Sequence, residues 1–122
     1  MKSENLIQRT TYAFALRIVK LSRFLVEKKR EYVLSKQILE SGTSIGANVE
    51  EAQAGQSRKD FISKYAIALK EARETRYWLR LLMGSSDRPT EAIVTLCQET
   101  EEIMRILAAI IVKTKQNTPG KT

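Results

Sequence analysis

The sequence predicts an all-α protein folded as an antiparallel up-down-up-down four-helix bundle. Apolar or small residues recur every three or four positions through four separate stretches, which is the period of an amphipathic helix. Only 2 of the 122 residues are proline and 5 are glycine, too few for the many turns of an all-β fold. The connections between the four stretches are short, and short connections make consecutive helices antiparallel neighbours. A chain of this length forms one domain, which we expect over residues 1–116.

The first helix is predicted over residues 5–28. Its apolar face consists of Ile7, Phe14, Ile18, Leu21 and Leu25, with Thr11 filling one position. On an ideal helical wheel, the side chains roughly opposite that face are Lys2, Arg9, Arg17, Lys20 and Arg23. Residues 28–30, Lys-Lys-Arg, close the helix, where cations suit the negative end of the helix dipole.

The second helix is predicted over residues 35–54, with Ser35 as the N-cap after a connection at residues 31–34 and Gly55 just beyond the C-terminal end. Its buried stripe consists of Ile38, Gly42, Ile45, Val49 and Ala52. Gly42 and Gly46 each cost a helix about 1 kcal/mol relative to alanine. A sequence tolerates that cost where another helix must approach very closely, so we expect an unusually tight helix contact here.

The third helix is predicted over residues 58–83, with Ser57 and Asp60 forming a capping box and Gly84 ending the helix. Its stripe consists of Phe61, Tyr65, Ala68, Ala72, Thr75, Leu79 and Leu82. A turn at residues 84–89 leads to a fourth helix over residues 89–113, capped by Asp87 or Arg88 with Pro89 in its first turn.

The fourth helix buries the stripe formed by Ile93, Leu96, Thr100, Ile103, Leu107 and Ile110, with Cys97 beside it as a small buried apolar residue. The sequence after about Val112 loses this periodicity, and we expect it to fray into a flexible tail at residues 117–122.

The composition removes most enzymatic mechanisms. The chain contains no histidine and one cysteine, which excludes histidine-dependent catalytic triads, histidine-containing zinc sites and an internal disulfide. We therefore expect a protein without catalytic activity, cofactor or metal. No apolar run reaches the roughly 20 residues of a membrane span, and the first ten residues lack the apolar core of a secretion signal. A cytoplasmic location is expected.

Polar side chains border the packed stripes of the second and third helices. The residues concerned are Ser44, Asn48, Glu51, Glu71, Glu74 and Trp78. One interpretation is a metal site built from carboxylates and an amide. The favoured interpretation is a structural hydrogen-bond network between helices, because the histidines that usually complete metal sites in bundles are missing.

The residues of these two helices also carry a family resemblance. The first segment is Ser-Ile-Gly-Ala-Asn at residues 44–48, followed one turn later by Glu51. The second segment begins about twenty residues further on and contains Glu71, Glu74 and Tyr-Trp-Leu at residues 77–79. This pattern, over about residues 35–82, resembles the four-helix-bundle family of 23S-rRNA intervening-sequence proteins, which includes the accessory variability protein of diversity-generating retroelements. The order of helices and loops matches over nearly the whole chain.

The resemblance implies a small basic bundle that assembles into a ring-like homopentamer. In the retroelement members it implies binding to a reverse transcriptase and to nucleic acid. In the intervening-sequence members it implies a gene located within an rRNA insertion. It does not imply catalysis by the bundle.

The distribution of charge gives an independent reason to expect nucleic-acid binding. Residues 1–30 sum to +6 and residues 57–86 to +4, whereas residues 31–56 sum to −3 and residues 87–122 to zero. The first and third helices therefore supply the whole net charge of +7. Arginine and lysine side chains bind phosphates and release counterions. The candidate phosphate-binding residues are Arg9, Arg17, Lys20, Arg23, Arg58, Lys59, Arg73, Arg76 and Arg80.

Two interpretations of this charge remain open. In the first, an oligomeric bundle binds RNA or DNA, and Tyr77 and Trp78 offer rings for base stacking, although Trp78 is better explained as a packing anchor. In the second, the basic faces only solvate a protein-interaction module. The first and third helices are adjacent or diagonal in the bundle, depending on its handedness, so the sequence does not decide whether their charges form one patch.

Overall fold

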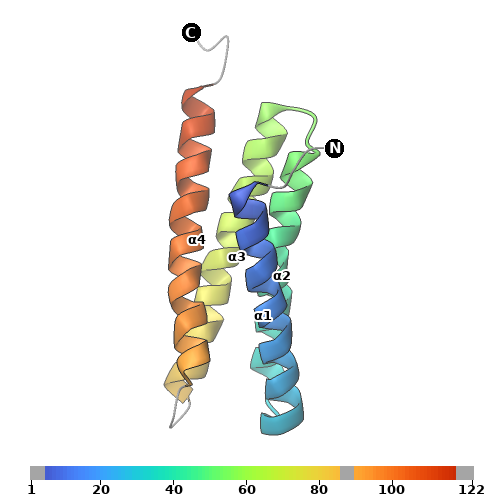
Figure 1. Ribbon diagram of the computed structural model, residues 1–122, viewed down its shortest axis with the longest axis vertical. Coiled ribbons are helices and arrows are strands. Elements are labelled where there is room, and N and C mark those ends of the chain that lie inside the picture. Colours follow the sequence, from blue (N-terminus) through green and yellow to red (C-terminus); the bar gives the residue numbers. More distant parts are fainter. Residues whose placement is uncertain (1–4, 86–89, 118–122) are drawn as a thin grey trace.

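The computed structural model describes residues 5–85 and 90–117, and within these residues all regular structure is helical. The helices are α1 (Leu6–Lys29), α2 (Val33–Gln53), α3 (Arg58–Ser85) and α4 (Glu91–Gln116). They run alternately down and up along one long axis (Figure 1). The predicted all-α bundle is confirmed. None of the described helices is both long and apolar enough to cross a membrane.

The packing of the four helices is uneven. α2 packs along α1 and α3, and α3 packs along α4, whereas α1 and α4 touch at only a few positions. Among the described residues no Cα atoms of α1 and α3 lie within 8 Å of each other, so these two helices are diagonal. The basic faces of α1 and α3 therefore lie on different sides of the bundle.

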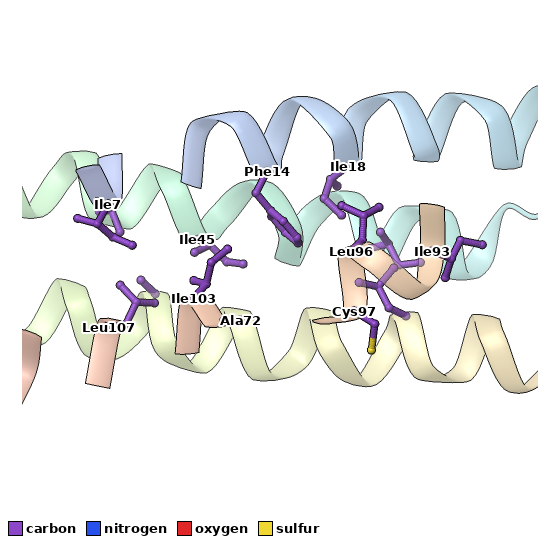
Figure 2. Close-up of a cluster of buried hydrophobic side chains, with 14 of the residues drawn as sticks. Ile7, Phe14, Ile18, Ile45, Ala72, Ile93, Leu96, Cys97, Ile103 and Leu107 are labelled. Carbon is purple, nitrogen blue, oxygen red and sulfur yellow. The ribbon is translucent and has the colours of Figure 1, made fainter. Parts of the chain in front are cut away.

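The core lies between the four predicted stripes, each of which faces inward. Phe14 and Ile18 of α1 point into the interior of the bundle, toward Leu96 of α4, as Figure 2 shows. The predicted stripe positions are buried apart from Leu21, Phe61 and Ile110, which are partly buried against the core. Burial of this kind stabilises the fold by roughly 25 cal/mol for each Å² of apolar surface removed from water.

The tight helix contact predicted at Gly42 and Gly46 is present between α2 and α1. A Cβ atom added to Gly42 would lie 2.8 Å from Cγ2 of Ile18. A Cβ atom added to Gly46 would lie 3.3 Å from the backbone oxygen of Thr11. The two glycines thus remove side-chain bulk where the α1 helix approaches α2.

Ser35 does not cap α2, contrary to the prediction. The helix begins at Val33, so Ser35 lies inside its first turn and is buried. Its hydroxyl donates to the carbonyl of Tyr32 (3.1 Å), and its own carbonyl accepts from Oγ of Ser22 in α1 (3.4 Å). Ser35 therefore contributes to the α1–α2 contact.

The sharp end of α1 explains the early start of α2. Arg30 adopts a left-handed conformation with φ 54°, which stops the helix after Lys29. The Glu31 carboxylate then accepts a hydrogen bond from the backbone N–H of Leu34 (3.1 Å), which satisfies one of the free donors in the first turn of α2. The connection is therefore shorter than the predicted one.

The ends of α3 and α4 also differ from their predicted positions. α3 continues through Gly84 to Ser85, so Gly84 does not end it. α4 is capped by Thr90, whose hydroxyl oxygen accepts from the N–H of Ile93 (3.3 Å), and the cap predicted within residues 87–88 was wrong. Pro89 and residues 118–122 lie outside the described residues. α4 runs to Gln116, beyond the predicted end, because Ile110 and Ile111 still pack against the core.

Two helix starts agree with the sequence. Asn5 forms a reciprocal capping box with Gln8, in which each side chain bonds the backbone N–H of the other residue. The Ser57 hydroxyl accepts from the N–H of Asp60 (3.0 Å) at the start of α3. Gly55 directly follows the Ala54 C-cap of α2.

Candidate nucleic-acid interface

Two of the predicted arginines, Arg73 and Arg76, line one side of a groove between α3 and α4. Arg73, Arg76 and Arg80 are spaced by three and four residues, so they share a face of α3. The groove has a volume of about 440 Å³ and is lined by Leu69, Arg73, Arg76, Glu101, Met104, Arg105 and Ala108. α4 thus adds a third arginine to the groove, Arg105, which the sequence analysis did not select.

Arg80 continues this face one turn beyond Arg76. Burial raises the pKa of the Cys97 thiol in α4, while the positive charges of Arg76 and Arg80 act in the opposite direction. Both charges therefore lie close enough to α4 to act on its buried thiol. The result is a row of guanidinium groups along α3 with Arg105 across the groove.

Two carboxylates of α4 offset part of this charge. Arg76 Nε lies 2.9 Å from Oε2 of Glu101, and Arg105 Nη2 lies 3.7 Å from Oε2 of Glu102. Both pairs are solvent-exposed, and such pairs contribute only about 0–1 kcal/mol, so a phosphate can compete for the arginines. Within the described residues no ion pair involves Arg73 or Arg80, which are both exposed.

The basic residues of α1 form a separate surface. Arg17 was predicted opposite the apolar face, but it turns toward α4, where Nη1 lies 2.5 Å from Oε2 of Glu99. Lys20 and Arg17 border a second groove of about 390 Å³ between α1 and α4, whose apolar lining includes Leu21 and Phe24. Arg9 and Arg23 are exposed on α1. Because α1 is diagonal to α3, these groups do not extend the arginine row of α3.

Arg58 and Lys59 lie at the opposite end of α3 from Arg80. The Arg58 guanidinium donates to the carbonyl oxygen of Asn117, and Lys59 is exposed. A helix rises 1.5 Å per residue, so about 22 Å separates Arg58 from Arg73 along α3. These two cations are remote from the groove that contains Arg73.

The residues of the predicted polar network bond mainly within their own helices. The Ser44 hydroxyl donates to the Glu40 carbonyl (2.7 Å), and Nδ2 of Asn48 donates to the Ser44 carbonyl (2.8 Å). Glu51 and Glu74 are exposed, and the described residues contain no cluster of acidic or cysteine side chains suited to a metal.

A different pair of side chains supplies a hydrogen bond across the α2–α3 contact. The Thr75 hydroxyl lies 2.9 Å from Oγ of Ser41, and both residues are buried. Ser41 lies on the same edge of α2 as Ser44 and Asn48. The sequence signal for this bond was the position of Ser41, a polar residue at helical spacing beside the glycine-rich stripe of α2.

Glu71 belongs to the predicted network and has a perturbed ionisation. Partial burial raises the pKa of Glu71, and the nearby charge of Glu74 raises it further, while Lys70 acts in the opposite direction. The Nε1 atom of Trp78 is buried without a hydrogen-bond partner among the described residues. Trp78 packs against the core, as a packing anchor would.

Tyr77 stands beside the arginine row with its ring in solvent. Its side chain is 52% exposed, and its ring meets the ring of Trp78 edge-on, with centroids 5.2 Å apart and planes inclined by 69°. Arg73 precedes Tyr77 by four residues and Arg80 follows it by three, so all three share a side of α3.

Comparisons with known proteins agree with the fold and add a family. The family described as "23S rRNA-intervening sequence protein" matches residues 3–109. A crystal structure of a protein with unknown function from the S23 ribosomal protein family of Bacteroides thetaiotaomicron is 49% identical to this chain, with a TM-score of 0.83. The match covers 87% of this chain and 98% of the Bacteroides chain. The comparison with curated proteins finds no match.

Proposed function

We propose that this chain, which belongs to the 23S rRNA-intervening sequence protein family, is a non-enzymatic bundle that binds RNA or DNA through the groove between α3 and α4. The observation that carries the proposal is the gathering of Arg73, Arg76 and Arg105 around one open groove, with Arg80 one turn away. Guanidinium groups bind phosphate oxygens with two parallel hydrogen bonds, and they also release the counterions of the nucleic acid.

The shape of the groove supports a backbone contact. It lies between two helices that run antiparallel (Figure 1), so phosphates bound in it would lie beside residues of both α3 and α4. Its floor consists of Leu69, Met104 and Ala108, which offer no reactive group. The cations and the apolar floor therefore favour binding of a polyanion over chemistry on a small substrate.

The family resemblance supports two biological settings for such binding. One is an accessory role beside a reverse transcriptase, and the other is a role linked to an rRNA insertion. A ring-like homo-oligomer, a pentamer by resemblance, would repeat the arginine groove on every subunit. Repeated grooves strengthen the electrostatic attraction for a long nucleic acid.

The decisive experiment measures binding of nuclease-treated protein to fluorescein-labelled RNA and to DNA of the same sequence, by fluorescence anisotropy over a range of salt concentrations. The test variant combines Arg73→Gln, Arg80→Gln and Arg105→Gln. The control combines Lys20→Gln, Arg23→Gln and Lys28→Gln on α1, which removes the same charge. We expect the groove variant to lose affinity by about tenfold or more and its salt dependence to flatten by roughly one unit per lost phosphate contact.

The alternatives give different results. Equal losses in both variants would mean that binding follows net charge and not the groove. A larger loss in the α1 control would place the site on α1. Absence of binding by the unaltered protein at low salt would overturn the proposed function.

A second candidate function is a protein-interaction module without a nucleic-acid role. The observation that favours it is the sparse α1–α4 contact, where Leu21, Phe24 and Leu96 line an apolar groove. A protein that binds no nucleic acid but forms a stable complex through this side would support this second function.

A further inference from the structure

We propose that the α3–α4 groove is specific for unpaired nucleic acid, with the phosphates held by the arginines and one base stacked on Tyr77. The inference rests on the proposed function and narrows its ligand to a single strand of RNA or DNA. The exposed ring of Tyr77, one turn from Arg73 and one turn from Arg80, is the feature that leads to it.

The position of Tyr77 suits stacking. Arg73 and Arg80 are seven residues apart, or about 10 Å along the helix axis, and Tyr77 lies between them. A strand whose phosphates contact both arginines therefore has its sugars and bases beside the phenol ring. Aromatic rings bind every base through its face, at about 1–3 kcal/mol per base.

The ring of Tyr77 is also supported from behind. The rings of Tyr77 and Trp78 meet edge to face at a centroid distance of 5.2 Å, and Trp78 itself packs against the core. This support limits the freedom of the exposed ring before a base arrives, so less conformational entropy is lost on binding.

A duplex cannot use this feature in the same way. Paired bases are stacked on each other and expose only their edges in the grooves. The arginine row and Tyr77 lie along the exposed side of α3, which packs against both α2 and α4. An unpaired strand can turn a base face toward Tyr77.

The chain supplies its own control for an exposed tyrosine. Tyr12 on α1 is 60% exposed, close to the exposure of Tyr77. It lies on the helix diagonal to α3, away from the arginine groove. A loss that depends only on aromatic exposure would affect both tyrosines, whereas stacking beside the arginine row of α3 affects Tyr77 alone.

The first test compares a single-stranded oligonucleotide with its fully paired duplex, using the unaltered protein, Tyr77→Ala, Tyr77→Phe and Tyr12→Ala. Fluorescence anisotropy at fixed salt gives each affinity, and circular dichroism checks that each variant is folded. We expect the protein to prefer the single strand. We expect Tyr77→Ala to lose about tenfold in single-strand affinity and little in duplex affinity, while Tyr77→Phe and Tyr12→Ala retain binding.

The second readout uses Trp78, the only tryptophan in the chain. A base stacked on Tyr77 changes the surroundings of the neighbouring indole, so single-strand binding should change the tryptophan fluorescence. A saturating duplex should change it much less. This signal depends on where the strand binds and not on affinity alone.

The results separate this inference from the proposed function. Equal affinity for single strand and duplex, with no effect of Tyr77→Ala but a strong effect of the groove arginine variant, would overturn the inference and leave the proposed function intact. Absence of any binding at low salt would overturn both.

Discussion

At the scale of single residues, two glycines set the distance between α1 and α2. Gly42 faces the side chain of Ile18, and Gly46 faces the backbone of Thr11. The helix-forming cost of each glycine, about 1 kcal/mol, is offset by the dense packing that the close approach allows. Ile18 and Thr11 are both fully buried as a result.

We therefore expect Gly42→Ala to destabilise the protein although alanine forms helices better than glycine. Its Cβ would lie 2.8 Å from Ile18, so a buried side chain must move, and overpacking of this kind costs about 1–3 kcal/mol. Gly42→Leu should lower the melting temperature further. Gly84→Ala is the matched control, because a Cβ there meets nothing within 4 Å. If Gly42→Ala and Gly84→Ala melted alike, the close contact would not be confirmed.

The raised pKa of Glu71 makes a prediction about stability and pH. Burial, and then the charge of Glu74, raise this pKa above its ordinary value of 4.5. Between pH 4.5 and the pKa of the folded state, the folded chain therefore keeps a proton on Glu71 that the unfolded chain has released. Stability must then fall as the pH rises from about 4.5 through the folded-state pKa. We expect Glu71→Gln to raise the melting temperature at pH 7 and to have less effect at pH 4.

Glu51→Gln, on the exposed surface of α2, is the control for this experiment. It removes the same formal charge without removing a partly buried carboxylate. Melting curves by circular dichroism at both pH values give the comparison. A gain at pH 7 of the same size in both variants would point to the overall charge and not to burial of Glu71.

At the scale of helices, α2 and α3 are joined by one buried side-chain hydrogen bond. Thr75 and Ser41 lie 2.9 Å apart, and each hydroxyl also bonds a backbone carbonyl of its own helix, at Glu71 and Gln37 respectively. The pair is buried in the α2–α3 contact, which is also bridged by a hydrogen bond from Nε2 of Gln53 to the Tyr65 hydroxyl (3.0 Å). The buried pair therefore fixes the relative register of the two helices as well as adding stability.

A double-mutant cycle measures this bond. Thr75→Val and Ser41→Ala should each destabilise by about 1 kcal/mol, and the double variant should cost less than their sum. Ser44→Ala with Thr75→Val is the control cycle, because the Ser44 hydroxyl bonds the carbonyl of its own helix at Glu40. Chemical denaturation gives each free energy of unfolding. Strict additivity in the Ser41 cycle would contradict a coupled pair.

At the scale of the whole molecule, the bundle has one weakly packed side. α1 and α4 contact each other at few positions, and the Arg17–Glu99 ion pair bridges them. Beside that ion pair, Phe24 is 41% exposed and lines an apolar groove. We propose that a second copy of the chain packs against this side.

Phe24→Ser tests that expectation. Light scattering coupled to size exclusion should show a multiple of the single-chain mass for the unaltered protein and a lower mass for the variant, because the apolar contact is lost. Val112→Ser is the control, since Val112 is also exposed and apolar but lines neither of the two grooves described. Equal masses for the unaltered protein and Phe24→Ser would exclude this surface as the main interface.

The sequence by itself determined the helices, the buried stripes and the close glycine contact. The helices and the buried stripes follow from the local periodicity of apolar residues. The close contact follows from Gly42 and Gly46, because glycine inside a helix is best explained by the close approach of another helix. It placed some helix ends wrongly, because a cap depends on how the chain turns. Arg30 ends α1 with a left-handed residue and so allows α2 to start before Ser35.

Only the tertiary structure decided which charges lie together. Helical spacing placed Arg73, Arg76 and Arg80 on one face of α3, but Arg105 joined them because α4 is the neighbour of α3. The same arrangement turned Arg17 toward Glu99 of α4, and it separated α1 from α3 across the diagonal. The physical reason is that electrostatic fields act through space, whereas sequence spacing fixes distances only within one helix.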